Sequence, residues 1–133
     1  MKESSKEEEE LLFKDLSQRL LYKVKCNVYG RIGTLTGLND YGAEIDYGNG
    51  EDTTCEIKYC LPYLRPMSSM TEEERKEYND IVKNIIDFID CPKSDSICLL
   101  ITLIDWLNAH HFDFRNLIER GLAIDCTGLH IYD

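Results

Sequence analysis

Two adjacent histidines followed by an aspartate are the residues of this sequence best suited to chemistry. His110 and His111 come shortly before Asp113, and an imidazole can transfer a proton near neutral pH or bind zinc. The pair also has a structural explanation, because it closes a predicted helix whose negative end favours a charged imidazole. Adjacent helical side chains point in different directions, so one histidine should face the core and the other water. We list His110 and His111 as candidate ligand-binding residues and expect no catalytic residue.

Cysteines and one further histidine supply the ligand types that zinc prefers. The candidates are Cys91, Cys98, Cys126 and His130. Their spacings lack the short C-x2-C pair of a zinc knuckle, so we expect neither a metal site nor a cofactor. The opening MKESSKEEEE has no apolar stretch of a signal peptide, and the chain holds six cysteines. We therefore expect reduced, buried thiols in a cytoplasmic protein that does not enter a membrane.

Motifs that mark the common enzyme classes are missing from the sequence. The chain has no G-x-S-x-G elbow, no Walker loop and no Rossmann fingerprint. The glycine-rich stretch GRIGTLTG at residues 30–37 lacks the Lys-Ser/Thr pair of a phosphate-binding loop and lies among predicted strands. We interpret it as turn chemistry and expect a protein that is not an enzyme.

A predicted helix that begins at Glu72 offers a candidate surface for a protein partner. Its outward-facing acidic residues are Glu73, Glu77, Asp80 and Asp87. Such a surface would attract a basic partner, and Trp106 would add an apolar anchor. A solvated helix face explains the same charges and a core position explains the tryptophan, so both interpretations stay open.

The amino-terminal half of the chain changes from a helical to a strand pattern. Leucines at helical spacing predict an amphipathic helix over residues 7–20, with glutamates in its first turn. Alternation of apolar and polar residues then predicts antiparallel strands. The strands are expected at residues 24–28, 43–47 and 55–59. Gly48-Asn49-Gly50 predicts a tight hairpin, and Pro62 and Pro66 should end the sheet.

The carboxyl-terminal half is predicted to be mainly helical. Thr71 and Glu74 form a capping box at the start of a helix that runs to about Ile89. Its expected buried face consists of Tyr78, Ile81, Val82, Ile85, Ile86 and Ile89. Residues 97–107 are almost continuously apolar, which fits a buried helix or a strand that leads into one. Another helix is expected over residues 113–120, where Asp113 would be the N-cap, with a final strand within residues 122–132.

These elements predict one α+β domain over residues 1–133. Its expected parts are an acidic helix (residues 1–21), a small SH3-like antiparallel sheet or barrel (22–66) and a mainly helical part (67–133), with three to four helices in all.

Two stretches of the sequence resemble a known family. PYLRPMSSMTEEE at residues 62–74 and IDWLNAHHFDFRNLIERGLAID at residues 104–125 are similar to a family of short uncharacterised proteins encoded by gut bacteria and their phages. The GTLTG and YGNGE segments also fit, so the resemblance covers most of the chain. It implies no particular chemistry. It does imply a phage or mobile-element accessory protein, a context in which small acidic proteins often bind other proteins.

A second resemblance is shorter. IDYGNGE at residues 45–51, with Leu-Arg-Pro at residues 64–66, is similar to features of Tudor domains, which are SH3-like barrels that hold methylated lysine or arginine in an aromatic cage. The cage candidates that this resemblance implies are Tyr41, Tyr47 and Tyr59. Tyr47 and Tyr59 share strand faces with Ile45 and Ile57, which instead indicates core positions.

Net charge limits the function classes. The chain has 15 Lys plus Arg and 25 Asp plus Glu, for a net charge of −10, which argues against direct binding of nucleic acid. The function that we expect is binding of a protein with a basic surface, as an inhibitor of a bacterial nucleic-acid-handling or defence protein. The alternatives are a small-ligand or metal-binding protein or enzyme that uses His110, His111 and the cysteines, and an oligomeric structural protein.

Overall fold

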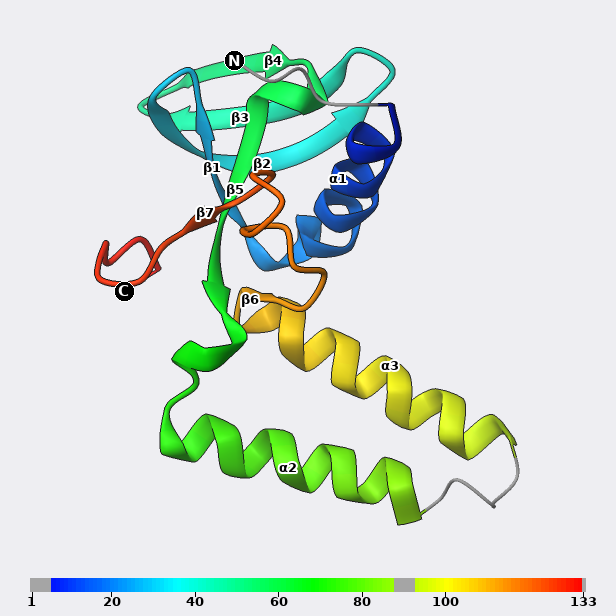
Figure 1. Cartoon of the computed structure of the whole chain (residues 1–133). Helices are drawn as coiled ribbons and strands as arrows, with labels where there is room; N and C mark the ends of the chain where they lie inside the picture. Colours follow the sequence, from blue (N-terminus) through cyan, green and yellow to red (C-terminus); the bar gives the residue numbers. More distant parts are fainter. Residues whose placement is uncertain (1–5, 88–92, 133) are drawn as a thin grey trace.

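The computed structural model describes residues 6–87 and 93–132, which form a mixed α+β structure. Figure 1 shows a curved sheet with one helix beside it and, below them, two helices next to each other. The α-helices are α1 (Lys6–Arg19), α2 (Glu72–Asp87) and α3 (Lys93–Ala109). The strands are β1 (Lys25–Val28), β2 (Arg31–Asn39), β3 (Gly42–Gly48), β4 (Glu51–Cys55), β5 (Cys60–Pro66), β6 (Phe112–Asp113) and β7 (Ile124–Asp125). Short 3-10 helices cover Leu20–Tyr22, Ile57–Tyr59 and Met67–Ser69.

Strands β1 to β5 form an antiparallel sheet in the order β4-β3-β2-β1-β5. The two-residue strands β6 and β7 pair in parallel with different parts of β5. The sheet is not closed into a barrel. The predicted hairpin lies between β3 and β4, where Gly48, Asn49 and Gly50 all have positive φ angles. The α+β class and the antiparallel sheet are thus confirmed.

Helix α1 covers the core side of this sheet. Leu12 and Leu16 are almost completely buried and pack in one cluster with Val28, Leu35 and Ile45 from the strands. The glutamates of its first turn stay at the solvent-facing start of the helix, where they oppose the helix dipole favourably. The amphipathic helix predicted at residues 7–20 is therefore confirmed.

A buried ion-pair network joins α1 to the segment that follows α3. Arg19 and Asp15 are both 0% exposed, and Arg19 Nε donates a hydrogen bond of 2.8 Å to Asp15 Oδ2. Arg19 Nη2 donates to the carbonyl oxygen of Phe112 at 2.6 Å, and Arg115 Nη1 donates to Asp15 Oδ1 at 2.9 Å. Buried charges are tolerated only when they are paired, so this network fixes α1 against residues 112–115.

Helices α2 and α3 lie side by side and extend away from the sheet (Figure 1). Helix α2 begins with the predicted capping box, in which Glu74 N–H donates to Thr71 Oγ1 at 3.1 Å and Thr71 N–H donates to Glu74 Oε1 at 2.9 Å. The face predicted for α2 is only half covered: Tyr78, Ile81, Val82 and Ile85 are partly buried, Ile86 is 61% exposed, and no described residue of α2 is fully buried. A single neighbouring helix covers only a narrow stripe of α2. The predicted face residue Ile89 lies outside the described residues.

Residues 97–107 are helical, which decides between the helix and the strand that the apolar run allowed. The helix ends at Ala109, one residue before the predicted end at His110 and His111. The expected burial is wrong for most of α3, because Ile97, Leu100 and Ile101 are each about half exposed while Leu107 is buried.

Two predictions about the sheet are wrong. Residues 55–59 are not one strand, because β4 ends at Cys55 and residues 57–59 form a 3-10 turn. Pro62 does not end the sheet, because it pairs with Cys26 inside the ladder, whereas Pro66 is the last residue of β5, where the strand was expected to end. A proline removes only its own N–H, and the residues around Pro62 and Pro66 still pair with their neighbours. Of the stretch interpreted as turn chemistry, Gly30 lies in a turn and residues 31–37 belong to β2.

The helix predicted at residues 113–120 is absent, and turns take its place. Asp113 is buried, and its carboxylate accepts hydrogen bonds from the N–H groups of Leu117 and Ile118 at 2.8 and 2.9 Å. Asn116 has a φ of +62°, which breaks helical geometry at the point where the helix would have formed. The final strand predicted within residues 122–132 is confirmed as the two-residue β7.

Substitution of Asp15 should be far more damaging than loss of an exposed carboxylate. Asp15→Asn leaves Arg19 and Arg115 without their shared counterion, and breaking a buried pair in this way costs about 3–5 kcal/mol of unfolding free energy. Glu51→Gln is the matched control, because it breaks the exposed Arg31–Glu51 ion pair of 2.6 Å and should cost less than about 1 kcal/mol. Urea denaturation followed by circular dichroism measures both. Equal losses of unfolding free energy in the two variants would contradict a stabilising buried ion pair at Asp15.

Candidate functional site

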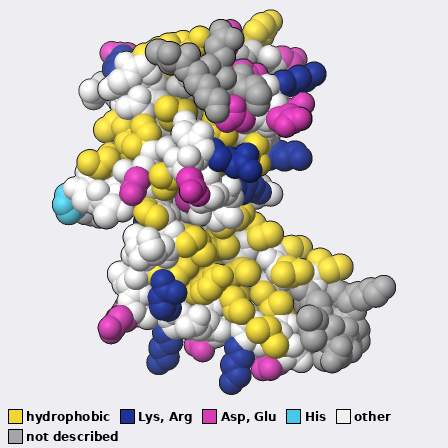
Figure 2. Space-filling view, viewed as in Figure 1, with side chains coloured by type: hydrophobic (Ala, Val, Ile, Leu, Met, Phe, Trp, Pro, Cys, Tyr) yellow, Lys and Arg dark blue, Asp and Glu magenta, His cyan; other side chains and the backbone are white. Residues whose placement is uncertain are grey.

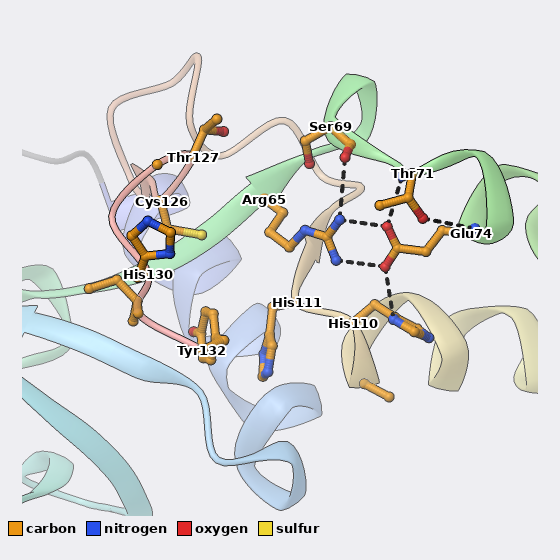
Figure 3. A pocket seen from close by; sticks show the side chains of 13 residues that line it. Arg65, Ser69, Thr71, Glu74, His110, His111, Cys126, Thr127, His130 and Tyr132 are labelled. Carbon is orange, nitrogen blue, oxygen red and sulfur yellow. Dashed lines mark hydrogen bonds and ion pairs between the residues drawn. The ribbon is translucent and has the colours of Figure 1, made fainter.

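A cavity of about 590 Å³ lies where β5, α2, α3 and the carboxyl-terminal segment meet. Figure 3 shows the side chains around it, with the arginine and glutamate on one side and the residues that follow β7 on the other. The lining includes both histidines that the sequence singled out, His110 and His111, together with Cys126 and His130. Residues far apart in the chain therefore share one site.

An ion pair between Arg65 and Glu74 dominates one wall of the cavity. Arg65 Nη1 and Nη2 donate to the two carboxylate oxygens of Glu74 at 2.7 and 2.6 Å (Figure 3). These hydrogen bonds lower the pKa of Glu74 to about 2 and raise the pKa of Arg65. His110 Nδ1 lies 3.2 Å from Glu74 Oε2, and the Arg65 guanidinium lies 4.3 Å from the centroid of the Phe112 ring. The wall thus joins the end of β5, the start of α2 and the end of α3.

His111 and Tyr132 form the opposite wall. Their rings stack at a centroid distance of 3.6 Å and an interplanar angle of 9°. The Tyr132 hydroxyl donates to the carbonyl oxygen of Tyr63 at 2.7 Å and accepts from the N–H of Lys25 at 2.9 Å. Burial, with the nearby charges of Arg19 and Arg65, lowers the pKa of His111 to about 4. Tyr132 therefore holds the carboxyl-terminal segment on the sheet, and His111 is neutral at pH 7.

The groups of this cavity are mostly engaged with one another. Arg65, Glu74 and His110 form a closed set, and Ser69 Oγ donates to the carbonyl oxygen of Pro66 at 2.7 Å. His111 Nδ1 is buried and has no hydrogen-bond partner among the described residues. Chemically, the arrangement is suited to clamping three elements together.

The zinc candidates are not brought together. Across residues 6–87 and 93–132, no three or more His, Cys, Asp or Glu side chains converge as metal ligands would. Cys126 and His130 line the cavity, whereas Cys98 is exposed on α3 and Cys91 lies outside the described residues. The other described cysteines, Cys26, Cys55, Cys60 and Cys126, are buried and form no disulfide with another described residue.

The three cage candidates do not form one cluster in the structure. Among the described residues, no ring contact joins Tyr41, Tyr47 and Tyr59 to one another. The Tyr47 ring carries the Arg31 guanidinium at 4.0 Å, the Tyr59 ring lies 5.2 Å from that of Tyr29, and Tyr41 is 84% exposed. The core position expected for Tyr59 is wrong, since it is 41% exposed on a 3-10 turn, whereas Tyr47 does pack against the core.

The acidic candidates on α2 fall into two groups. Glu73, Asp80 and Asp87 are exposed and form no ion pair with any residue that the structure describes; we call them the acidic ridge. Glu77 instead accepts a hydrogen bond of 3.0 Å from Trp106 Nε1. Trp106 is half-buried between α2 and α3, and its ring contacts those of Tyr78, His110 and Phe112. Trp106 therefore holds the two helices together and is not an exposed anchor.

Sequence reasoning missed an exposed aliphatic surface on the same two helices. Figure 2 shows hydrophobic side chains gathered over the α2–α3 part of the molecule. The exposed members, which we call the aliphatic face, are Ile86 (61%), Ile97 (55%), Leu100 (46%), Ile101 (53%) and Ile104 (37%). The signal was present in residues 97–104, which are apolar on all sides of the helix except at Thr102. Such a helix needs cover on two sides.

Comparisons of the chain with family models, curated proteins and solved structures found no match. None of the helices in the described residues has the length and apolar character required to cross a membrane. The site must therefore be interpreted from its own geometry.

The depressed pKa of His111 predicts a stability loss on mild acidification. The unfolded chain binds a proton at this residue near pH 6.5, whereas the folded chain binds it only near pH 4. Stability that is present above pH 6.5 is therefore lost as the pH falls toward 4, by up to about 3 kcal/mol. His111→Phe keeps a ring against Tyr132 and removes the titrating group. Urea denaturation at a series of pH values should show a shallower loss for this variant, and parallel curves for variant and wild type would refute the assignment.

Proposed function

We propose that this chain is a non-enzymatic protein-binding protein and that its acidic ridge on α2 recognises a partner with a basic surface. The observation that carries the proposal is the ridge itself. Glu73, Asp80 and Asp87 are seven residues apart, so they project from one side of α2. They are exposed and have no counterion among the described residues. Free carboxylates of this kind steer a basic partner toward the surface that carries them.

The distribution of charge supports a role for α2 over the sheet. Residues 72–87 contain six acidic and three basic residues, whereas residues 22–65 contain six acidic and five basic residues. The sheet is therefore close to neutral, and it serves as an SH3-like scaffold that carries the helices. The engagement of Arg65, Glu74 and His110 with one another supports a structural role for the cavity.

The family resemblance supports a more specific role. A phage or mobile-element accessory protein with an acidic helix would act in the cytoplasm of a bacterial host, as an inhibitor of a nucleic-acid-handling or defence protein. The basic surface with which such a partner grips phosphates is the surface that regularly spaced carboxylates would occupy.

Neutralising the ridge should weaken capture of the partner. The triple variant Glu73→Gln/Asp80→Asn/Asp87→Asn removes three charges without changing side-chain size, and exposed ion pairs of about 0.5 kcal/mol each predict a roughly tenfold loss of affinity. Pull-down from a bacterial lysate at low and high salt, followed by titration with the captured protein, measures this loss.

A second triple variant is the matched control. Asp40→Asn/Asp52→Asn/Glu56→Gln removes the same number of exposed carboxylates from the sheet part, so net charge changes equally in both variants. The control should bind like the wild type. A partner that is lost equally from both variants, or that is retained by the ridge variant at low salt, would contradict recognition by the ridge.

A further inference from the structure

Four of the five members of the aliphatic face lie on one side of α3. Ile97, Leu100, Ile101 and Ile104 follow the i, i+3, i+4, i+7 spacing that places side chains on one face of a helix. The opposite side of α3 packs on α2 through Trp106, which bonds to Glu77. Helix α3 thus has one apolar side covered by α2 and a second apolar side on which Ile97, Leu100, Ile101 and Ile104 are 37–55% exposed.

The same side of α3 is covered at one end. Leu107 and Asn108, seven residues after Leu100 and Ile101, are 5% and 2% exposed where α3 meets the rest of the fold. The face therefore begins as a packed interface at Leu107 and continues uncovered toward Ile97. Exposed aliphatic surface of this extent on a water-soluble chain marks an interaction surface.

We propose that the aliphatic face is covered by a second copy of this chain, with the α2–α3 helices of two protomers packed as a four-helix bundle. The two-fold axis of such a dimer sets the same patch of each protomer against the other. The spacing of three and four residues along α3 suits helix packing at a small crossing angle, as in four-helix bundles. Ile86 adds a contribution from α2, so both helices take part.

Composition favours a second copy over an unrelated partner. Residues 97–104 contain no charged side chain, and homodimer interfaces are more apolar than the interfaces of transient complexes. An aliphatic surface without charges offers nothing by which a basic partner would be selected, but it complements itself. The length also suffices, because helices of 16 and 17 residues span about 25 Å, which is long enough for one helix pair to pack along another.

Charge does not oppose this pairing. The acidic ridge lies on another side of α2 from Ile86, since Glu73, Asp80 and Asp87 repeat every seven residues along one side, and Ile86, next to Asp87, is turned about 100° from it. Each protomer thus keeps its ridge on the outside of the bundle. The inference does not depend on the partner of the proposed function, because it uses a different side of the same helices.

Sedimentation velocity of the whole chain from low to high micromolar concentration tests the proposal. We expect a monomer–dimer equilibrium that persists at high salt, because apolar contacts are not screened. Ile101→Asp places a charge in the centre of the contact and should weaken dimerisation at least a hundredfold. Leu129→Asp is the matched control, because Leu129 is 51% exposed but lies outside α2 and α3, and it should dimerise like the wild type.

Circular dichroism should show that the Ile101→Asp variant keeps the helix content of the wild type, because Ile101 is exposed. If this variant loses helix content, Leu100→Asp is a second variant of the same face. A wild-type chain that stays monomeric at every concentration overturns the proposal, as does a dimer that survives Ile101→Asp or dissociates in salt. Each of these results leaves the acidic ridge to be judged by its own variants, so the two proposals fail separately.

Discussion

The carboxylate of Asp15 is the constraint on which the arrangement of this chain depends. It accepts hydrogen bonds from two arginines that are distant in sequence, Arg19 in α1 and Arg115 after α3, at 2.8 and 2.9 Å. Arg19 also bonds to the carbonyl oxygen of Phe112. Because a buried guanidinium is tolerated only with its counterion, α1 and the segment after α3 must keep their relative position. That position fixes where α3 leaves the core.

From this anchored base, α2 and α3 are held by polar and aromatic contacts at one end. Arg65, Glu74 and His110 join the helix ends to β5, and Trp106 closes the space between the helices. Beyond these contacts the helices bury little, and their apolar side chains stay exposed. The fold thus holds the helices firmly at one end while leaving one of their sides uncovered.

Local signals in the sequence predicted what depends on local physics. The alternation at Val24 and Cys26 and the reciprocal bonds of Thr71 and Glu74 involve neighbours in sequence, and the structure has them as expected. The failed predictions involve tertiary context. The positive φ of Asn116 replaces a helix by turns, and β5 accommodates Pro62 because strands on both sides pair with its other residues.

The candidate site also separates what local sequence predicts from what only the tertiary structure shows. Sequence spacing located the histidines, yet only the fold shows that His110 pairs with Glu74 and that His111 stacks on Tyr132. Amphipathic spacing in α2 predicted that a face would be covered, but spacing is silent on whether the cover comes from the same chain or from another. The exposure of Ile86 and Ile101 shows that the described part of the chain does not itself cover this face.

Helices α2 and α3 therefore combine two surfaces whose contacts respond differently to salt. Contacts made by the ridge weaken as salt screens them, whereas contacts made by the aliphatic face do not. In the dimer that we propose, the aliphatic faces pair and so bring two acidic ridges onto one particle. A basic partner with repeated sites would then meet two ridges at once, and avidity would raise its affinity without any new contact. Pairing through α3 would in this way strengthen recognition through α2.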